Sequence, residues 1–334
     1  MTRPPPSPYD SLIAPGPTSP RARDAEARQT IIRRRRLALA GAIAALAALI
    51  VGAIIGASAG GGDPETAVEE SSTAELPRGG TEILPGNLLV GFYGAPQDEE
   101  LGALGIGSPE EASAALAEQA AAYEGNRPVL PILELIAVVA NADPGEDGMY
   151  RTRQPSRVID EYLAEARSSQ SLLVLDIQPG SASFQEEFDV LLPYLREPDV
   201  GLALDPEWHV PPGVAPGSEI GSVEAETVNS IAAQLSILVE EHDLPQKLLI
   251  VHRFTADMVT DPEELRPQPG VALVLNVDGF GVPEEKTAKY EELQAPRGSG
   301  LFSGFKLFYK EDTDLMSPND VLSLKQKPDL VIYE

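Results

Sequence analysis

Residues 171–205 hold two apolar runs, SLLVLDI (171–177) and VGLALD (200–205), on either side of the amphipathic segment FQEEFDVLLPYLR (184–196). Nearly continuous apolar runs of this length are typical of strands that are buried on both faces, as in parallel sheets. Parallel strands need a crossover connection, and an amphipathic helix is the usual one. This stretch therefore predicts a strand–helix–strand unit.

The same unit recurs along the chain. Six further apolar runs occupy residues 87–93, 129–139, 247–252, 271–277, 304–308 and 329–333, and further amphipathic segments occupy residues 109–124, 157–168, 224–241 and 283–294. Eight alternations over about 250 residues are the signature of a (β/α)8 barrel. A doubly wound open sheet is the alternative, but it usually carries a glycine-rich phosphate turn, which this sequence lacks. We predict an α/β fold, a TIM barrel over residues 85–334.

Two features depart from a regular barrel. Prolines interrupt residues 255–270, after the fifth strand, so this segment should hold at most a short helix. The chain stops at Glu334, directly after the eighth strand, so the eighth helix is missing. We expect residues 75–86 or a neighbouring chain to cover that gap.

A long uncharged segment precedes the barrel. Residues 37–58 carry no charge, and as a helix they would span a hydrocarbon core of roughly 30 Å. Four arginines, residues 33–36, come directly before them, so the positive-inside rule places the N-terminus in the cytoplasm. We predict a single-pass signal-anchor in the plasma membrane, with the barrel outside the cell. Residues 57–59 resemble a signal-peptide cleavage site, but the apolar run exceeds the usual core of about 7–15 residues.

Composition assigns the remaining segments and excludes several functions. Residues 1–36 are basic and rich in Pro, Arg and Ser, which predicts a disordered cytoplasmic tail, and residues 59–84 predict a flexible acidic linker. Beyond residue 58 the chain has 49 acidic and 17 basic residues, so repulsion argues against nucleic-acid binding there. The chain has no cysteine, which excludes disulfides, thiolate nucleophiles and cysteine-based metal sites. Oligomeric state cannot be read from the sequence.

Polar residues gather where the predicted strands end. The strand-to-helix connections 140–156 and 209–223 are long, and barrel enzymes build their sites from these connections. The candidate catalytic carboxylates are Asp176, Asp205, Glu207 and Asp278. The candidate substrate-binding residues are Tyr93, Glu134, Gln178, Trp208, His252, Lys306, Tyr309 and Tyr333. Because burial of an unpaired carboxylate is costly, such a cluster indicates groups that are solvated, paired or poised by a raised pKa. Salt-bridged wall residues, with Arg253, Lys306 and Lys310 as partners, are the structural alternative.

The pair Asp205 and Glu207 is the sharpest local feature. On a strand, residues i and i+2 share a face, which would place these carboxyl groups about 6–7 Å apart. Two like charges at that separation raise one pKa, as a general acid requires, and paired carboxylates are what cleavage of a glycosidic bond needs. Trp208 is the only tryptophan, and an aromatic ring at the mouth can stack on a sugar. Simple packing under a loop would explain Trp208 equally well.

An Asp-x-Glu at the end of strand 4 resembles the catalytic motif of glycoside hydrolase families 18 and 25, which are barrels that act on N-acetylhexosamine polymers. Gly201, Asp205 and Glu207 match the family-18 pattern Asp-Gly-x-Asp-x-Asp-x-Glu, whereas Val200 and Ala203 stand where that family has acids. The resemblance implies that Glu207 is the acid and Asp205 its helper. The residue that closes strand 8 is Tyr333 where family 18 has Trp, and Tyr93 stands where family 25 has Asp. More broadly, the chain resembles exported barrel proteins of high-GC Gram-positive bacteria.

A metal-dependent hydrolase is the competing enzyme class. His252 with Asp176, Asp205 and Asp278 could bind a divalent ion. The chain has only three histidines and no His-x-His or His-Glu-x-x-His spacing, so we predict neither a metal nor another cofactor. We therefore expect a membrane-tethered extracytoplasmic barrel that acts on, or binds, a cell-envelope polysaccharide. A non-catalytic barrel that binds a glycan or a protein is the alternative.

Overall fold

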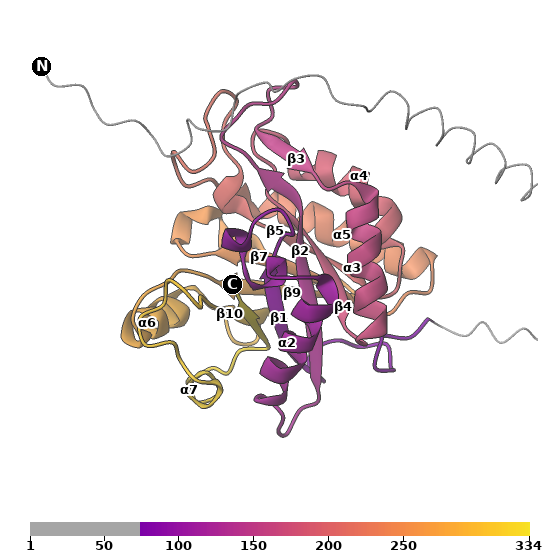
Figure 1. Ribbon diagram of the computed structural model, residues 1–334, viewed down its shortest axis with the longest axis vertical. Coiled ribbons are helices and arrows are strands. Elements are labelled where there is room, and N and C mark those ends of the chain that lie inside the picture. Colours follow the sequence, from indigo (N-terminus) through magenta and orange to yellow (C-terminus); the bar gives the residue numbers. More distant parts are fainter. Residues whose placement is uncertain (1–73) are drawn as a thin grey trace, which may run out of the picture. The chain divides into compact units, whose positions relative to one another are not determined.

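The computed structural model describes residues 74–334 (Figure 1). The predicted tail (1–36), the predicted membrane anchor (37–58) and the greater part of the predicted linker (59–84) lie outside the described residues. Within residues 74–334, no helix combines the length and the apolar character needed to cross a membrane.

Eight parallel strands form a closed ring. They are β1 (Leu88–Gly94), β2 (Val129–Ala140), β4 (Leu172–Ile177), β5 (Val200–Leu204), β7 (Lys247–Arg253), β9 (Val271–Val277), β10 (Phe302–Leu307) and β11 (Leu330–Tyr333). Each pairs with the next in this order, and β1 pairs with both β2 and β11, which closes the ring. The prediction of an eight-stranded parallel barrel is confirmed, and each predicted apolar run forms one of its strands.

The helices lie outside the ring of strands, with α6 and α7 on the side opposite α3 and α4 (Figure 1). They are α2 (Pro109–Ala121), α3 (Ser156–Ser168), α4 (Phe184–Leu195), α5 (Ala225–Glu241), α6 (Pro283–Leu293) and the short α7 (Pro318–Leu322). Serine side chains cap the first turns of α2, α4 and α7 by accepting hydrogen bonds from backbone N–H groups. The five predicted amphipathic segments all form helices.

Shorter elements fill the connections. The segment after β7 contains only the 3-10 turns η4 (Ala256–Met258) and η5 (Pro262–Glu264) and the strand β8 (Val259–Thr260), as its prolines predict. β8 pairs with β6 (Val223–Glu224), and β3 (Arg151–Arg153) is antiparallel to the end of β2. Three further 3-10 turns follow β1 and β5: η1 (Glu99–Leu101), η2 (Ala103–Gly105) and η3 (Pro206–Trp208).

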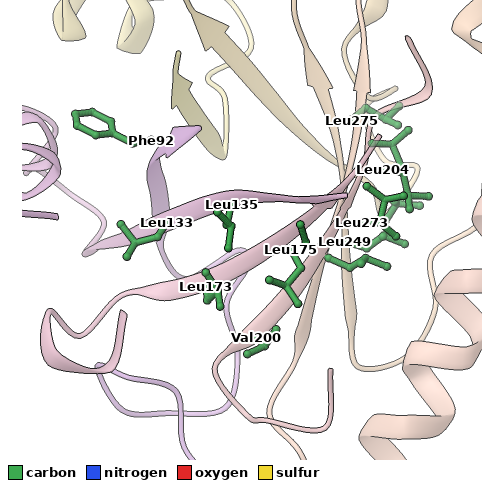
Figure 2. Close-up of a cluster of buried hydrophobic side chains, with 14 of the residues drawn as sticks. Phe92, Leu133, Leu135, Leu173, Leu175, Val200, Leu204, Leu249, Leu273 and Leu275 are labelled. Atoms are coloured by element: carbon green, nitrogen blue, oxygen red, sulfur yellow. The ribbon is translucent and has the colours of Figure 1, made fainter. Parts of the chain in front are cut away.

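Side chains alternate between two buried layers along every strand, because successive residues of a strand point to opposite faces. The outward layer packs against the helices and includes Leu173, Leu175 and Leu249, which Figure 2 shows together with their neighbours. The inward layer fills the barrel and includes Val174, Ile250 and Ile332. The barrel is therefore apolar over most of its length, and its polar inward residues stand out.

Residues 76–84 close the N-terminal end of the barrel. Leu76, Ile83 and Leu84 are buried in the inward layer. Gln246, just before β7, accepts hydrogen bonds at Oε1 from the N–H groups of Ile83 (2.7 Å) and Leu84 (2.9 Å). This segment, which we expected to cover the place of the eighth helix, thus seals the opposite end from the predicted site.

A cluster of aromatic rings covers the outer side of β11. Tyr333 stacks on Tyr309 at 5.1 Å between ring centroids and meets Phe92 and Tyr123 edge-on. Its hydroxyl group lies 2.6 Å from that of Tyr123, on the chain that follows α2. The rings pack β11 against β1 and the end of α2.

Replacement of Gln246 tests this closure. We expect Gln246→Ala to lower the free energy of unfolding by about 1–3 kcal/mol, since two buried N–H groups lose their acceptor. Gln246→Glu keeps an oxygen at the same position and should lose less. Chemical denaturation of the two variants measures the difference, and equal losses would contradict the assignment to the hydrogen bonds.

Candidate functional site at the C-terminal mouth of the barrel

Polar side chains from all eight strands meet at the C-terminal end of the barrel interior. They point inward at or just beyond the strand ends, except Glu134, which lies in the middle of the long strand β2 opposite Tyr93 of β1, and all but Glu334 are buried. They are Tyr93, Glu134, Asp176, Gln178, Asp205, His252, Asn276, Asp278 and Lys306, with the half-buried Glu334 after β11. The sequence places most of them correctly. Asn276 and Glu334 were not predicted from the sequence. Residues two apart on a strand share a face, so Asn276, two before Asp278, and Glu334, two after Ile332, could have been recognised as inward.

His252 lies between two carboxylates in the centre of this layer. Its Nδ1 is 2.8 Å from Asp278 Oδ2, and its Nε2 is 2.9 Å from Glu134 Oε1. Burial disfavours the charged imidazolium, but the charges of Asp278 and Glu134 outweigh it and raise the pKa of His252 well above its usual value. Because both ring nitrogens face carboxylate oxygens, these surroundings favour the imidazolium form of His252.

Lys306 provides the second positive charge. Its Nζ is 2.6 Å from Glu334 Oε2 and 3.7 Å from Asp278 Oδ2, and it lies 3.7 Å from the centre of the Tyr93 ring. Burial alone would raise the pKa of Asp278, but His252 and Lys306 together hold it below its usual value. Asp278 therefore stays ionised between two cations.

Asp176 and Asp205 share the hydroxyl group of Tyr93. That hydroxyl is 3.4 Å from Asp176 Oδ2 and 3.3 Å from Asp205 Oδ2, and it accepts a hydrogen bond from Gln178 Nε2 at 2.8 Å. Burial raises the pKa of both carboxyl groups, and the charge of Asp205 raises that of Asp176 further, to well above its usual range. This part of the layer holds carboxyl groups that retain protons more readily than free aspartate.

Glu207 stands above the buried layer, at the rim of an open cavity of about 360 Å³. The strand argument for Asp205 and Glu207 was wrong, because β5 ends at Leu204 and Glu207 lies in the 3-10 turn η3. Pro206 has no N–H to continue the ladder, and its fixed φ suits the first position of a turn. Both carboxylates nevertheless line the cavity.

The environment of Glu207 raises its pKa. Burial has the largest effect, the charges of Asp205 and Asp278 add to it, and the pKa reaches about 7. The cation that opposes this shift is Lys306, which is already paired with Glu334. Glu207 is thus a carboxyl group that is half protonated near neutral pH and faces an open space.

Aromatic side chains form much of the cavity wall. Trp208, Phe254, Phe280 and Phe308 line it together with Tyr93. Phe280 is 65% exposed, so its ring is available to a ligand. Flat apolar rings next to carboxylates suit a ligand with both apolar faces and hydroxyl groups.

The structure does not bring every predicted residue into the cavity. Tyr333 and Tyr309 lie in the aromatic cluster on the outer side of β11, where they contact each other and Gln119. Glu134, Asp176 and His252 lie below the cavity and are fully buried. Candidate metal-ligating atoms of these three side chains all fall within 4.8 Å of one another, a grouping that no local sequence spacing reveals.

Comparison of the chain with models of protein families and with curated proteins finds no match. The fold and the site define the class to which it belongs. It is an α/β protein with a closed eight-stranded parallel barrel of the TIM type, and a carboxylate-rich cavity opens at the C-terminal ends of its strands.

Two lysines test whether the buried network depends on its cations. Lys306→Met should lower the free energy of unfolding by about 3–5 kcal/mol, because Glu334 and Asp278 lose a buried partner. Lys310→Met removes an exposed pair with Glu100 of nearly equal length, 2.7 Å, and should change stability little. Denaturation curves compare them, and similar small losses would show that Lys306 is not needed for charge balance.

Proposed function

We propose that the protein binds and hydrolyses a glycan at the C-terminal mouth of its barrel, with Glu207 as the general acid. The observation that carries the proposal is the position of Glu207, half-buried in an aromatic-lined cavity with its pKa raised to about 7. Protonation of a leaving glycosidic oxygen needs a carboxyl group that still holds its proton near neutral pH.

The neighbouring groups support this assignment. Asp205 lines the same cavity and raises the pKa of Glu207 by its charge. It also hydrogen-bonds to Tyr93, so its orientation is held from below. Asp205 is the helper of the acid, and Asp278, kept ionised by His252 and Lys306, supplies negative charge that favours an oxocarbenium-like centre.

The resemblance of residues 201–207 to glycoside hydrolase families 18 and 25 suggests the substrate class, polymers of N-acetylhexosamine. Trp208 and Phe280 are the rings on which a sugar would stack. The 22 uncharged residues at 37–58, directly after four arginines, support a membrane anchor with the barrel outside the cell. There, peptidoglycan and related cell-envelope glycans are the polymers within reach of a short linker.

Replacement of Glu207 tests the catalytic role. Glu207→Gln should lower the rate of reducing-end release from peptidoglycan or chitin-like oligomers by about 10²–10⁴-fold. Glu219→Gln is the control, since Glu219 is an exposed glutamate of the same connection after β5, and it should retain the wild-type rate. Because the acid acts in its protonated form, the wild-type rate should fall as the pH rises through about 7, a limb that the Glu207→Gln variant should lack.

The result separates the two functional classes. Saturable binding of an oligomer by the wild type without release of reducing ends would support a non-catalytic glycan-binding barrel. Neither binding nor hydrolysis of any of these glycans would contradict the proposal as a whole.

The anchor is tested on the cell that expresses the chain. We expect the intact chain in the membrane fraction, resistant to carbonate extraction, with residues 85–334 digested by protease added outside spheroplasts. Mass spectrometry of the N-terminus provides the second measurement. A mature chain that begins near residue 60 and is released to the medium would show a cleaved signal peptide instead.

A further inference from the structure

Three side chains lie close together beneath the cavity floor, and the glycan proposal assigns no joint role to them. Glu134 on β2, Asp176 on β4 and His252 on β7 are all 0% exposed. His252 Nε2 is 2.9 Å from Glu134 Oε1 and 3.9 Å from Asp176 Oδ1. Their separation along the chain is large, so only closure of the barrel brings them together.

These separations suit a shared metal ion. An ion that lies about 2.1 Å from each ligand keeps any two ligand atoms within about 4.2 Å of one another. Both distances from His252 Nε2 fall inside that limit. An ion at this point would touch an imidazole nitrogen and two carboxylate oxygens with only small movements of the side chains.

Two buried oxygens in this group have no hydrogen-bond donor. Within residues 74–334, Glu134 Oε2 and Asp176 Oδ1 are inaccessible to solvent and unpaired. Asp176 Oδ1 is the oxygen that faces His252 Nε2. Unpaired carboxylate oxygens are costly in a protein interior, and a cation bound by these two carboxylates would reduce that cost.

The hydrogen bonds around His252 are of the kind found around metal-bound histidines. Such a histidine usually binds a carboxylate through its other ring nitrogen, which fixes the ring orientation. His252 Nδ1 meets Asp278 Oδ2 at 2.8 Å, and Asn276 Nδ2 donates to Asp278 Oδ1 at 2.7 Å. Tyr93 likewise contacts the second oxygen of Asp176. Two of the three ligands that would bind the ion, His252 and Asp176, are thus oriented by a neighbour.

Charge balance points the same way. Glu134, Asp176, Asp205 and Asp278 are buried together, and the inward cations among the described residues of this layer are His252 and Lys306. A divalent ion bound by Glu134 and Asp176 would neutralise the excess.

We propose that Glu134, Asp176 and His252 bind one divalent transition-metal ion inside the barrel. One imidazole and two carboxylates suit Mn²⁺, Fe²⁺ or Zn²⁺, whereas Ca²⁺ prefers an all-oxygen shell and Mg²⁺ retains several waters. The ion takes the place of the proton that Nε2 of His252 otherwise donates to Glu134, and that proton leaves to solvent. The site does not depend on glycan chemistry, since it ties β2, β4 and β7 together whatever the cavity binds.

The test measures metal binding by the full-length chain in detergent, stripped with a chelator and titrated with Mn²⁺, Zn²⁺, Mg²⁺ and Ca²⁺. We expect one Mn²⁺ or Zn²⁺ per chain and a saturable rise in Tm, with weaker effects of Mg²⁺ and Ca²⁺. Asp176→Asn and His252→Gln should weaken binding at least 100-fold, and Asp278→Asn about 10–100-fold. Asp199→Asn is the control, since Asp199 is a buried carboxylate just before β5 that pairs with Arg167 outside this layer, and it should bind the metal as the wild type does.

A second measurement keeps the proposal testable if ligand variants fail to fold. Electron spin-echo spectra of wild-type protein with one equivalent of Mn²⁺ should show coupling to a single imidazole nitrogen. Absence of that coupling would overturn the proposal. So would weak binding at many sites by the acidic surface, or equal losses of metal affinity in Asp199→Asn and Asp176→Asn. These measurements are made without a glycan, so their outcome does not depend on whether the hydrolase assignment is correct.

Discussion

Closure of the sheet, by the pairing of β1 with both β2 and β11, is the constraint on which the rest of the structure depends. Once the ring is closed, the inward residues at the C-terminal strand ends share one small space. Carboxylates that lie far apart in the sequence then become neighbours in an apolar surrounding, where like charges repel strongly. His252 and Lys306 are the counter-charges that make this arrangement tolerable.

The same constraint divides the layer by depth. At the bottom, His252 contacts Glu134 and lies 3.9 Å from Asp176, and its other ring nitrogen contacts Asp278 at the cavity floor. At the top, Glu207 is left facing the cavity with a raised pKa, because Lys306 is already bound to Glu334. The mouth holds more carboxylates than cations. The two cations therefore pair with some of the carboxylates, and Glu207 is left without a cationic partner. The proposed glycan chemistry uses the upper group, and the proposed cation would bind to the lower group.

Much of the fold and part of the site follow from the sequence. The apolar runs mark the strands because burial on both faces demands continuous apolar residues, and polar residues at their ends, such as Asp176 and His252, mark the mouth. Finer geometry does not follow. Glu207 lies in a turn and not on β5, because Pro206 has no N–H to continue the strand pairing. Tyr333 faces outward because it follows the inward residue Ile332, and successive residues of a strand point to opposite faces. The contact of His252 with Glu134 depends on the angular position of each strand around the ring, which local sequence does not encode.

The central claim is that a glycan enters the cavity above the carboxylate layer, and Trp208 offers the most direct test. It is the only tryptophan in the chain and it lines the cavity, so its fluorescence responds to a ligand that enters that space. Titration with N-acetylhexosamine oligomers should give a saturable change in intensity and a shift of the emission to shorter wavelength as the ring loses water. An emission spectrum that stays constant up to millimolar oligomer, in protein shown to be folded, would contradict the account.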